Sequence, residues 1–432
     1  ARNAAAVEAT DWVVLSEGET EFVGYDSTSA LTRILRYRNV KQKGKSFYQI
    51  VLSVTPFYAE MGGQVGDSGW LINGDEKIEV YDTKRENGQA VHLTTSLPAD
   101  VNAEFEARIN EAARRATECN HSATHLLHAA LRQVLGTHVE QKGSFVSPNV
   151  LRFDFSHFQK LTPEEIRAVE HIANANVRKA IPLDEHRSLP IAEARAMGAM
   201  ALFGEKYGEE VRVIKYGDSV ELCGGTHVPN TGNIGIIRIV LESSIAAGIR
   251  RIEAITGEVA EEAIDSLTDT LRAVGEMFHN APDIRQAIRK AIEENTELRK
   301  EVEEFMKERT RNVAKELLET AESYGGMKIV SLAGVRTPDM VKNVAFLVRQ
   351  MSSTATAFIA ATADIAGKPL LTVALTDDLV SGGLNASTIV RNAAKAIKGG
   401  GGGQPGFAQA GGKDADGLSI AFTSMHDALK GN

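Results

Sequence analysis

Cysteine is scarce in this sequence, with only Cys119 and Cys223 among 432 residues. Two cysteines exclude a disulfide-built scaffold and favour a reducing compartment. No apolar run approaches the roughly 18 residues that span a bilayer, which excludes a membrane protein. Hydrophobic residues make up 43% and charged residues 24% of the chain, a globular composition that excludes a disordered class. At roughly 100 to 200 residues per domain, the length predicts two to four domains.

Basic charge is not in excess either, because the formal net charge is −9. The net charge is −5 for residues 1–257, −7 for 258–324 and +3 for 325–432. Acidic residues therefore concentrate in the middle segment, and both flanking parts can present basic faces to a polyanion. The overall acidity does not exclude a nucleic-acid partner.

The chain falls into four segments that together predict an α+β fold. Residues 1–102 carry short β-type runs between turns, which predicts a β-rich, barrel-like part of a larger domain. In 103–257, apolar residues first recur at helical spacing up to Gly136, and further helices and strands complete an α+β part. Residues 258–324 predict a helical linker or coiled coil. Residues 325–432 alternate strand-like and helical runs and predict a small α/β domain.

Two histidine-containing pairs carry the strongest chemical signal. His121 and His125 are four residues apart in the predicted helix, so their imidazoles share one face and can converge on one ion. Cys223 and His227 supply a thiolate and a third imidazole, and two glycines between them allow a tight turn. Three nitrogens and one sulfur suit tetrahedral Zn²⁺. We therefore predict one zinc ion bound by these four residues.

Two neighbouring residues are weaker ligand candidates. Cys119 lies two residues before His121, about 200° around the helix, and is expected to face away from the ion as a buried, inert thiol. His128 is close enough in sequence to approach the metal, or it is satisfied by a backbone carbonyl. A zinc-protease helix needs glutamate directly after its first histidine, where this sequence has Ser122, so a peptidase is not expected.

The two pairs, with Gln141-Lys142-Gly143-Ser144 and Tyr58-Ala59-Glu60-Met61-Gly62-Gly63-Gln64, resemble the editing domain of the alanyl-tRNA synthetase family. The resemblance continues through 200–208 and 248–253, and 399–414 resembles the glycine-rich part of that family's C-terminal domain. It implies that the aminoacylation portion lies outside this sequence, which begins without methionine or a signal stretch. The polypeptide alone is then not expected to charge tRNA, and ATP serves only that missing portion.

The resemblance implies a cytoplasmic editing activity that hydrolyses tRNA(Ala) esterified with serine or glycine. Binding alone rejects an added hydroxyl or a missing methyl by factors of only about 10 to 200, so a second, hydrolytic pocket is needed. Thr124 is the expected partner of the serine hydroxyl, or it is back-bonded to its own helix. Gln141, expected in a loop after the helix, is carried over as a pocket residue that holds the ester carbonyl or a water. Zinc either orients the substrate or a water, or only ties the fold together.

Several further residues are candidate tRNA contacts. The glycines that follow residue 59 permit close approach to a phosphate or sugar, or form a bulged hairpin. The basic run 33–45 can follow an RNA backbone, with Tyr37 available to stack, or it is a solvated face. The stretch 399–414 lacks the serine or threonine of a P-loop, which argues against ATP and for RNA backbone contacts. The candidates are Gly62, Gly63, Gln64, Arg38, Lys41, Lys43, Gly402 and Gln404.

The expected partners follow from the same resemblance. The acceptor end of tRNA(Ala) is expected at the editing pocket and its outer corner at the C-terminal domain. A homodimer through the helical segment and the C-terminal domain is implied as well, and the apolar stripe of the helical segment fits either a dimer seam or a solvated spacer. Two other functions stay open: a non-catalytic, zinc-stabilised RNA-binding module, and a free-standing zinc hydrolase that acts on another ester or amide.

Overall fold

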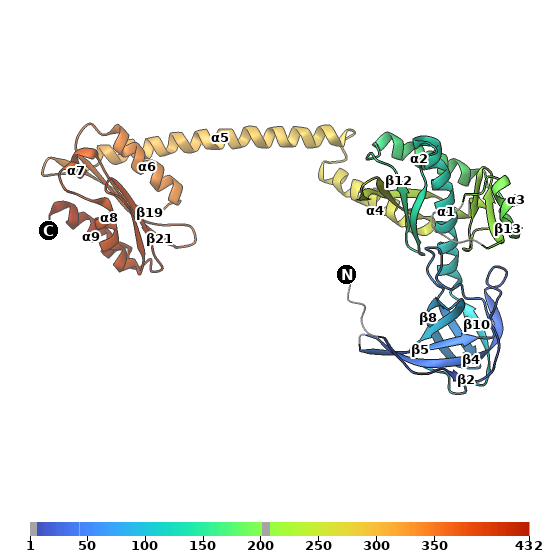
Figure 1. Ribbon diagram of the computed structural model, residues 1–432. Helices are drawn as coiled ribbons and strands as arrows, with labels where there is room; N and C mark the ends of the chain where they lie inside the picture. The colour runs from blue at the N-terminus through green and yellow to red at the C-terminus, as the bar shows by residue number, and fades with distance from the viewer. Residues whose placement is uncertain (1–6, 43, 201–207, 432) are drawn as a thin grey trace. The chain divides into compact units, whose positions relative to one another are not determined.

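The computed structural model describes residues 7–42, 44–200 and 208–431 (Figure 1). The chain divides into two compact units, unit 1 (residues 1–274) and unit 2 (residues 275–432). Among the described residues, no helix is long and apolar enough to cross a membrane.

The N-terminal part of unit 1 is built from strands (Figure 1). The strands are β1 (Val7–Ala9), β2 (Val13–Val14), β3 (Glu21–Phe22), β4 (Ser29–Gln42), β5 (Lys45–Leu52), β6 (Val54–Thr55), β7 (Gly69–Asn73), β8 (Glu76–Glu86), β9 (Gln89–Thr94) and β10 (Glu104–Ile109). β4 pairs with β10 on one side and β5 on the other, and β7, β8 and β9 connect these two, so the strands close into a ring. Inward-facing side chains such as Ile50, Leu71 and Phe105 fill it. The β-rich character expected for this segment is therefore present.

The long helix begins later than the sequence suggested. Residues from 104 form strand β10, and the helix α1 spans Glu111–Leu135, so the predicted start near 103 is wrong. The alternation of exposed and buried residues in β10 is the strand period, which the helical pattern that follows had masked. Asn110 caps α1 by accepting a hydrogen bond from the Ala113 amide at 3.2 Å, and Gly136 ends it.

The rest of unit 1 surrounds α1 with two sheets and further helices. Strands β11 (Gln141–Val146), β12 (Leu151–Ser156), β17 (Ile249–Thr256) and β16 (Ile237–Ala246) form one antiparallel sheet in that order. Strands β13 (Asp184–Pro190), β14 (Glu210–Tyr216) and β15 (Ser219–Leu222) form the other. The helices are α2 (Pro163–Arg178), α3 (Ile191–Ala196) and a 3₁₀ turn, η1 (Thr231–Ile234).

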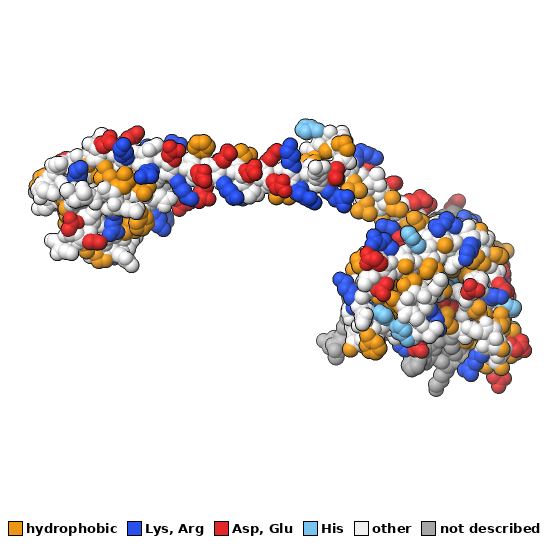
Figure 2. Space-filling view, turned by 90° about the horizontal axis from the view of Figure 1, so that it is seen from above, with side chains coloured by type: hydrophobic (Ala, Val, Ile, Leu, Met, Phe, Trp, Pro, Cys, Tyr) orange, Lys and Arg blue, Asp and Glu red, His pale blue; other side chains and the backbone are white. Residues whose placement is uncertain are grey.

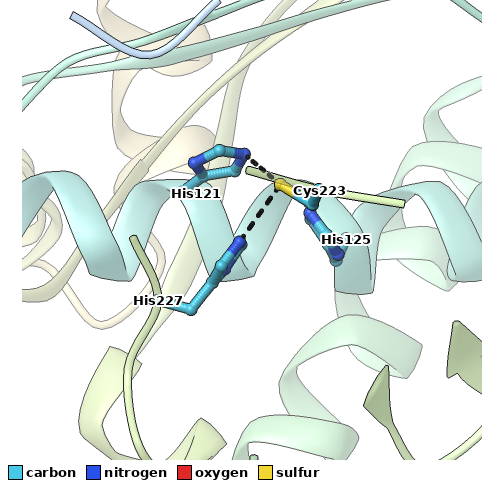
Figure 3. Close-up of side chains that lie close together, drawn as sticks. All are labelled: His121, His125, Cys223 and His227. Atoms are coloured by element: carbon cyan, nitrogen blue, oxygen red, sulfur yellow. Dashed lines mark hydrogen bonds between the residues drawn. The ribbon is translucent and has the colours of Figure 1, made fainter. Parts of the chain in front are cut away.

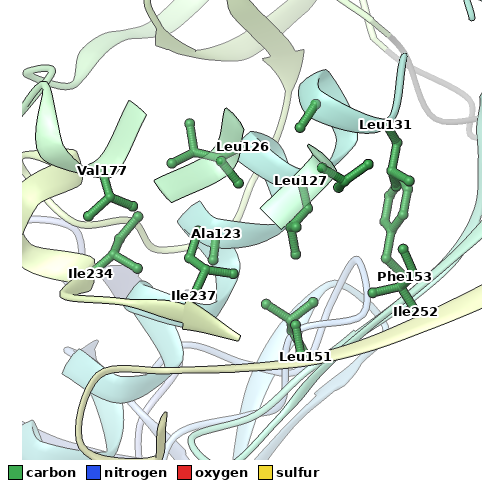
Figure 4. Packing of buried hydrophobic residues seen from close by; sticks show 14 of the residues in the cluster. Ala123, Leu126, Leu127, Leu131, Leu151, Phe153, Val177, Ile234, Ile237 and Ile252 are labelled. Carbon is green, nitrogen blue, oxygen red and sulfur yellow. The ribbon is translucent and has the colours of Figure 1, made fainter. Parts of the chain in front are cut away.

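One apolar face of α1 holds this part together (Figure 4). Leu126, Leu127 and Leu131 project from α1 into a cluster with Phe153 of β12 and Ile252 of β17, and all five are at most 1% exposed. Burial of each leucine contributes roughly 1.5–3 kcal/mol. Because residues four apart share a helix face, this packing also fixes the direction in which the opposite face of α1 points.

Two helices lead from unit 1 into unit 2, as expected for the linker segment. α4 spans Gly257–Met277 and α5 spans Ile284–Glu319. Acidic and basic side chains are interspersed along α5 (Figure 2), and i,i+4 pairs such as Lys307–Glu303 at 2.6 Å join some of them. Among the apolar side chains on this helix, Leu298, Val302 and Phe305 are exposed.

Unit 2 contains a mixed sheet covered on both faces by helices (Figure 1). The strand order is β18 (Glu322–Tyr324), β19 (Met327–Val335), β20 (Thr356–Ala363), β21 (Pro369–Leu375), β23 (Phe407–Gly411), β22 (Gly400–Gln404). The helix α6 (Pro338–Met351) and the end of α5 pack on one face, and α8 (Ala386–Ala393) and α9 (Leu418–Lys430) pack on the other. The short α7 (Asp377–Ser381) and η2 (Ala394–Ile397) connect them. The expected alternation of strands and helices is present, but the glycine-rich stretch forms strand β22, which the sequence did not indicate.

Candidate metal centre and adjoining cavity

Four side chains from two distant parts of unit 1 converge on one point (Figure 3). His121 and His125 project from α1, and Cys223 and His227 come from the loop after β15. The ligand atoms of all four lie within 4.8 Å of one another. The Cys223 Sγ lies 3.3 Å from Nε2 of both His121 and His227.

This geometry fits a zinc ion. In a tetrahedral site with Zn–S near 2.3 Å and Zn–N near 2.0–2.1 Å, sulfur and nitrogen ligands stand about 3.5 Å apart. The observed 3.3 Å separations from Cys223 Sγ to His121 and His227 are close to that spacing. The three histidines are each at most 8% exposed, and Cys223 is half-buried.

The far nitrogen of each histidine faces a polar side chain, as expected for metal ligands. His121 Nδ1 lies 2.7 Å from Gln64 Oε1, and His227 Nδ1 lies 3.1 Å from Ser122 Oγ. His125 Nδ1 faces Glu221 Oε2 at 3.7 Å. These contacts leave the Nε2 atoms of His121 and His227 directed at the thiol, where the ion is expected.

The loop that carries Cys223 is clamped from two sides. The Arg212 guanidinium donates to the carbonyls of Cys223 at 2.8 Å and Gly225 at 2.6 Å, and also to Glu185 at 2.7 Å. Tyr25 of the N-terminal part donates its hydroxyl to the Gly224 carbonyl at 2.6 Å. The guanidinium carbon lies 4.1 Å from the centroid of the Tyr25 ring, a cation–π contact.

Glycine at position 225 is required by close approach. A Cβ there would stand 2.0 Å from Cε1 of His121 and 2.7 Å from Gln64 Oε1. The loop backbone therefore presses against the histidine ring, and this contact, not a positive φ, accounts for the glycine.

Burial keeps the three imidazoles neutral. Desolvation, with neighbouring imidazoles and the Arg212 guanidinium, lowers the pKa of His121 and His227 well below the usual value. Desolvation also lowers the pKa of His125, although the Glu221 carboxylate opposes this shift. Neutral imidazole is the form that binds a metal, so the three histidines are in the ligating form at neutral pH.

A cavity of about 490 Å³, here the site cavity, opens beside the four ligands. His121, His125 and Cys223 line it, together with Thr124 and Gln141. Further lining residues are Tyr58, Met61, Gly62, Arg85, Ser144, Gly208, Glu210, Val211, Arg212, Glu221, Leu222, Gly224 and Gly225. The volume lies in the range of small-ligand sites.

Thr124 and Gln141 both line this cavity, but their side chains differ in hydrogen bonding. The Thr124 hydroxyl donates to the Asn120 carbonyl at 2.9 Å, which is the back-bonding that the sequence allowed as an alternative. Its oxygen can still accept a hydrogen bond from a ligand. Gln141 is the first residue of β11, so its predicted loop position is wrong. Its side-chain amide forms no hydrogen bond within the described part of the chain.

The two weaker ligand candidates lie outside the four-residue cluster. The Cys119 thiol donates to the Asn233 carbonyl at 3.3 Å, and burial raises its pKa to about 11. It faces away from the site, as predicted, but is half-buried. His128 Nδ1 lies 2.9 Å from Glu221 Oε1 and therefore pairs with a carboxylate, neither with the ion nor with a backbone carbonyl.

The predicted tRNA contacts Gly62, Gly63 and Gln64 differ in their surroundings. Gln64 is fully buried and bonded to His121, so the prediction that its side chain contacts tRNA is wrong. Gly62 and Gly63 adopt positive φ angles of 59° and 87° in the tight turn before it. Gly62 lines the site cavity, and Gly63 packs against Ser144.

The basic run is largely engaged within the fold. Arg38 pairs with Glu86 at 2.7 Å and lies 4.4 Å from the Trp12 ring. Tyr37 is half-buried against the core, and its stacking on RNA stays a prediction. Lys41 is exposed near the end of β4. Lys43 lies outside the described residues, as do 201–207 of the motif at 200–208.

The C-terminal candidates lie on the edge strand of the unit 2 sheet. β22 pairs only with β23, so its other side is unpaired among the described strands. Gln404 is exposed and Gly402 is half-buried beside Arg391. Exposed backbone amides at such an edge are available to a partner.

Sequence reasoning missed the residues that hold the ligands. Ser122 was considered only as the residue that rules out a peptidase, although it lies beside a ligand. Glu221 lies two residues before Cys223, which is a usable local signal. Arg212 and Tyr25 have no sequence signal, because their contacts with the loop depend on tertiary structure.

Three family models match the chain. The model described as threonyl and alanyl tRNA synthetase second additional domain matches residues 211–253, which include Cys223 and His227. The model for class II (A) tRNA synthetases matches residues 2–112. The DHHA1 domain model matches residues 325–431.

Curated relatives match over nearly the whole chain. Alanine–tRNA ligase of Parabacteroides distasonis is 56% identical over 99% of this chain and 49% of that protein. The ligases of Cytophaga hutchinsonii and Flavobacterium psychrophilum are 48% and 40% identical over the same share of the chain. The chain spans about half the length of these relatives. Among solved structures, the C-Ala domain from Aquifex aeolicus alanyl-tRNA synthetase is 24% identical, covering 26% of this chain and 98% of that chain, with a TM-score of 0.24.

Proposed function

We propose, since the chain belongs to the alanine–tRNA ligase family, that its unit 1 hydrolyses tRNA(Ala) carrying serine or glycine in place of alanine. The observation that carries the proposal is the site cavity, which brings three of the four candidate zinc ligands together with Thr124 and Gln141. In the reaction, water adds to the ester carbonyl carbon and the bond from that carbon to the ribose oxygen breaks. The proton goes to the ribose oxygen, which releases the amino acid and tRNA.

Thr124 is the proposed selector for serine. Its hydroxyl proton is used on the Asn120 carbonyl, so its oxygen is left to accept a hydrogen bond. The serine side chain offers that proton and alanine does not. Because Thr124 is 4% exposed, a serine hydroxyl bound there is shielded from water, which strengthens the preference.

Gln141 is the proposed positioning group for the ester carbonyl or the attacking water. Its amide offers both a donor and an acceptor at the cavity wall. Arg212 lines the same cavity and places positive charge beside the ester or the neighbouring phosphate. Its side chain is 10% exposed, so this charge is little screened by water.

His121, His125, Cys223 and His227 are the proposed ligands of one zinc ion. Zinc, when bound, supplies positive charge that orients the substrate terminus and fixes the loop to α1. Four protein ligands are typical of a structural ion, so the closed donor set also supports the second candidate function, a zinc-stabilised RNA-binding module without activity.

Unit 2 is the proposed tRNA-binding part. Residues 325–432 of this unit have a net charge of +3, and the edge strand β22 carries Gly402 and Gln404. The exposed Leu298, Val302 and Phe305 of α5 are proposed to form a homodimer seam.

The test is a deacylation assay with seryl-, glycyl- and alanyl-tRNA(Ala), run beside a count of bound zinc. We expect hydrolysis of the first two and not of the third, with one zinc per chain. In Thr124→Val, hydrolysis of the seryl ester should slow by about 10- to 100-fold, since an unpaired buried hydroxyl costs about 1–3 kcal/mol. The glycyl ester should slow less, because glycine has no hydroxyl.

Three results would each contradict a different part of the proposal. Equal slowing of both esters in Thr124→Val means that Thr124 only supports the helix. A chain that binds zinc and tRNA but hydrolyses neither mischarged species is the inactive RNA-binding module. Hydrolysis of small esters without any tRNA preference supports the free-standing hydrolase.

A further inference from the structure

A second cavity adjoins the site cavity in unit 1. This barrel cavity has a volume of about 430 Å³. Three residues, Tyr58, Met61 and Arg85, line both cavities. The two spaces are therefore neighbours that share part of their lining.

The barrel cavity presents flat aromatic surfaces. Phe22, Tyr25 and Tyr58 line it, and Phe22 stands at the centre of this group, with ring centroids 5.0 Å from Tyr25 and 6.3 Å from Tyr58. Phe22 lies in β3, which pairs with β6 outside the ring, and its side chain is 37% exposed, although phenylalanine is more often buried. An exposed aromatic ring inside a cavity is a stacking surface for a planar group.

Polar groups at the rim of the cavity complement the edge of a nucleobase. Gln89 accepts a hydrogen bond from the Arg36 guanidinium through Oε1, which leaves its amide nitrogen as a donor. Glu19 is exposed and supplies a carboxylate acceptor. A donor and an acceptor beside aromatic rings suit the carbonyl and amino groups of a base such as cytosine.

Arg85 stands where the two cavities meet. It is exposed, and it forms no ion pair with any acid in the described ranges. Its Nη1 donates to Met61 Sδ at 2.9 Å. A cation at the junction of two nucleotide-sized spaces suits the phosphate that links two nucleotides.

We propose that the barrel cavity binds the base of the nucleotide on the 5′ side of the esterified terminal adenosine. Phe22 stacks on that base, Glu19 and Gln89 bind its edge, and Arg85 contacts the connecting phosphate. This inference rests on the proposed function, because it requires the esterified adenosine in the site cavity. It assigns to the N-terminal ring a role in holding the unpaired 3′ end of the substrate.

The test uses a dinucleotide, cytidylyl-adenosine with serine joined by a 3′-amide, which cannot be hydrolysed. A matched probe lacks the cytosine base. We expect the zinc-loaded chain to bind the probe with the base about 10- to 100-fold more tightly, the range for one base stacked on an aromatic ring. In Phe22→Leu this ratio should fall below about threefold. The matched control, Tyr81→Leu, removes an exposed ring from β8 that lines neither cavity and should keep the ratio.

A second variant guards against a folding defect in Phe22→Leu. Arg85→Gln changes an exposed side chain, and it should lower the ratio of affinities for the dinucleotide over 3′-serylamino-adenosine. The proposal is overturned if the unmodified chain binds the probes with and without the base equally tightly. It is also overturned if the preference for the base is unchanged in Phe22→Leu. Because the probes are not cleaved, a failure here is separate from a failure to hydrolyse seryl-tRNA(Ala), which tests the proposed function.

Discussion

The two halves of the metal centre are built by different means. His121 and His125 belong to α1, where the helix period places both rings on one face and the leucines on another face anchor the helix. Cys223 and His227 belong to a loop, whose carbonyls are held by Arg212 and Tyr25. Local geometry positions the first pair, and contacts between distant segments position the second.

This difference decides where the site is vulnerable. A helix of 25 residues with a buried apolar face keeps its histidines in place even when one outer contact is lost. A loop without its clamps has no such support, and its ordering must then come from the metal itself. We therefore expect the loop half to respond more strongly to changes outside the ligand set.

The largest effect is expected from removing the thiolate. Cys223→Ser should reduce bound zinc well below one ion per chain and lower the unfolding midpoint of unit 1 by more than about 10 °C, because structural zinc contributes folding free energy directly. Atomic absorption and thermal unfolding of the full chain measure both.

The chain contains its own control for this substitution. Cys119→Ser alters the only other cysteine, which faces the Asn233 carbonyl. Zinc content should stay unchanged there. Full zinc occupancy in Cys223→Ser would remove the site as described.

The next effect concerns the clamp on the loop. Arg212→Gln removes the guanidinium from the carbonyls of Cys223 and Gly225, and zinc affinity should weaken by about 10- to 100-fold, as for other residues that orient ligands. A competition titration with a chelator measures the affinity.

Arg187→Gln is the matched control for Arg212→Gln. Arg187 pairs with Asp26 and Glu185 in the same network, and its side chain is 48% exposed. Among the described residues it donates to no carbonyl of the loop. Its loss should change the affinity by less than about threefold. Equal effects of the two arginines would mean that net charge, and not the clamp, matters.

The same contrast explains what the sequence could predict. The period of 3.6 residues places His121 and His125 on one face of the helix and Cys119 on another, so both points were predicted correctly. That Cys223 and His227 converge with them was inferred from the kind of ligands that zinc binds. No local sequence pattern places a loop against a helix a hundred residues earlier. The roles of Arg212, Tyr25 and Gln64 were not predictable, because each depends on a contact between segments far apart in the chain.

The strands β10 and β22 were not predicted, for related reasons. Strand β10 was absorbed into the helix because the strand is short and leads directly into α1. The glycines of β22 gave no strand signal, since glycine weakens strands and is depleted in them. In the folded chain these glycines lie against β23, where added Cβ atoms at Gly401 and Gly403 would collide with its backbone.

A smaller effect is expected from pH on the helix half. Burial raises the pKa of Glu118, one turn before His121, to about 7, from an ordinary value of 4.5. The folded state therefore keeps a proton that the unfolded state loses, and this contribution is full below about pH 4.5 and is lost as the pH rises through about 7. Between pH 5 and 8 the unmodified chain should lose about 2 kcal/mol of unfolding free energy relative to Glu118→Gln.

Denaturant unfolding of both proteins in excess zinc measures this difference. Comparison of the two cancels other titrating groups, and Glu164→Gln, which removes an exposed carboxylate paired with Arg167 at the start of α2, shows the effect of losing a surface charge. Parallel stability curves for the unmodified chain and Glu118→Gln would mean that the carboxyl ionises normally inside the fold.

The smallest effect isolates the contact between the N-terminal part and the loop. Tyr25→Phe keeps the ring on which the Arg212 guanidinium lies and removes only the hydroxyl that donates to the Gly224 carbonyl. One neutral hydrogen bond contributes about 1 kcal/mol, so zinc affinity should weaken by about fivefold. Tyr81→Phe removes an exposed hydroxyl from the same part and should have no effect. If Tyr25→Phe weakens zinc as much as Arg212→Gln does, the N-terminal part holds the loop directly, and the two clamps act as one unit. If it has no effect, Arg212 alone holds the loop and Tyr25 only supports the guanidinium.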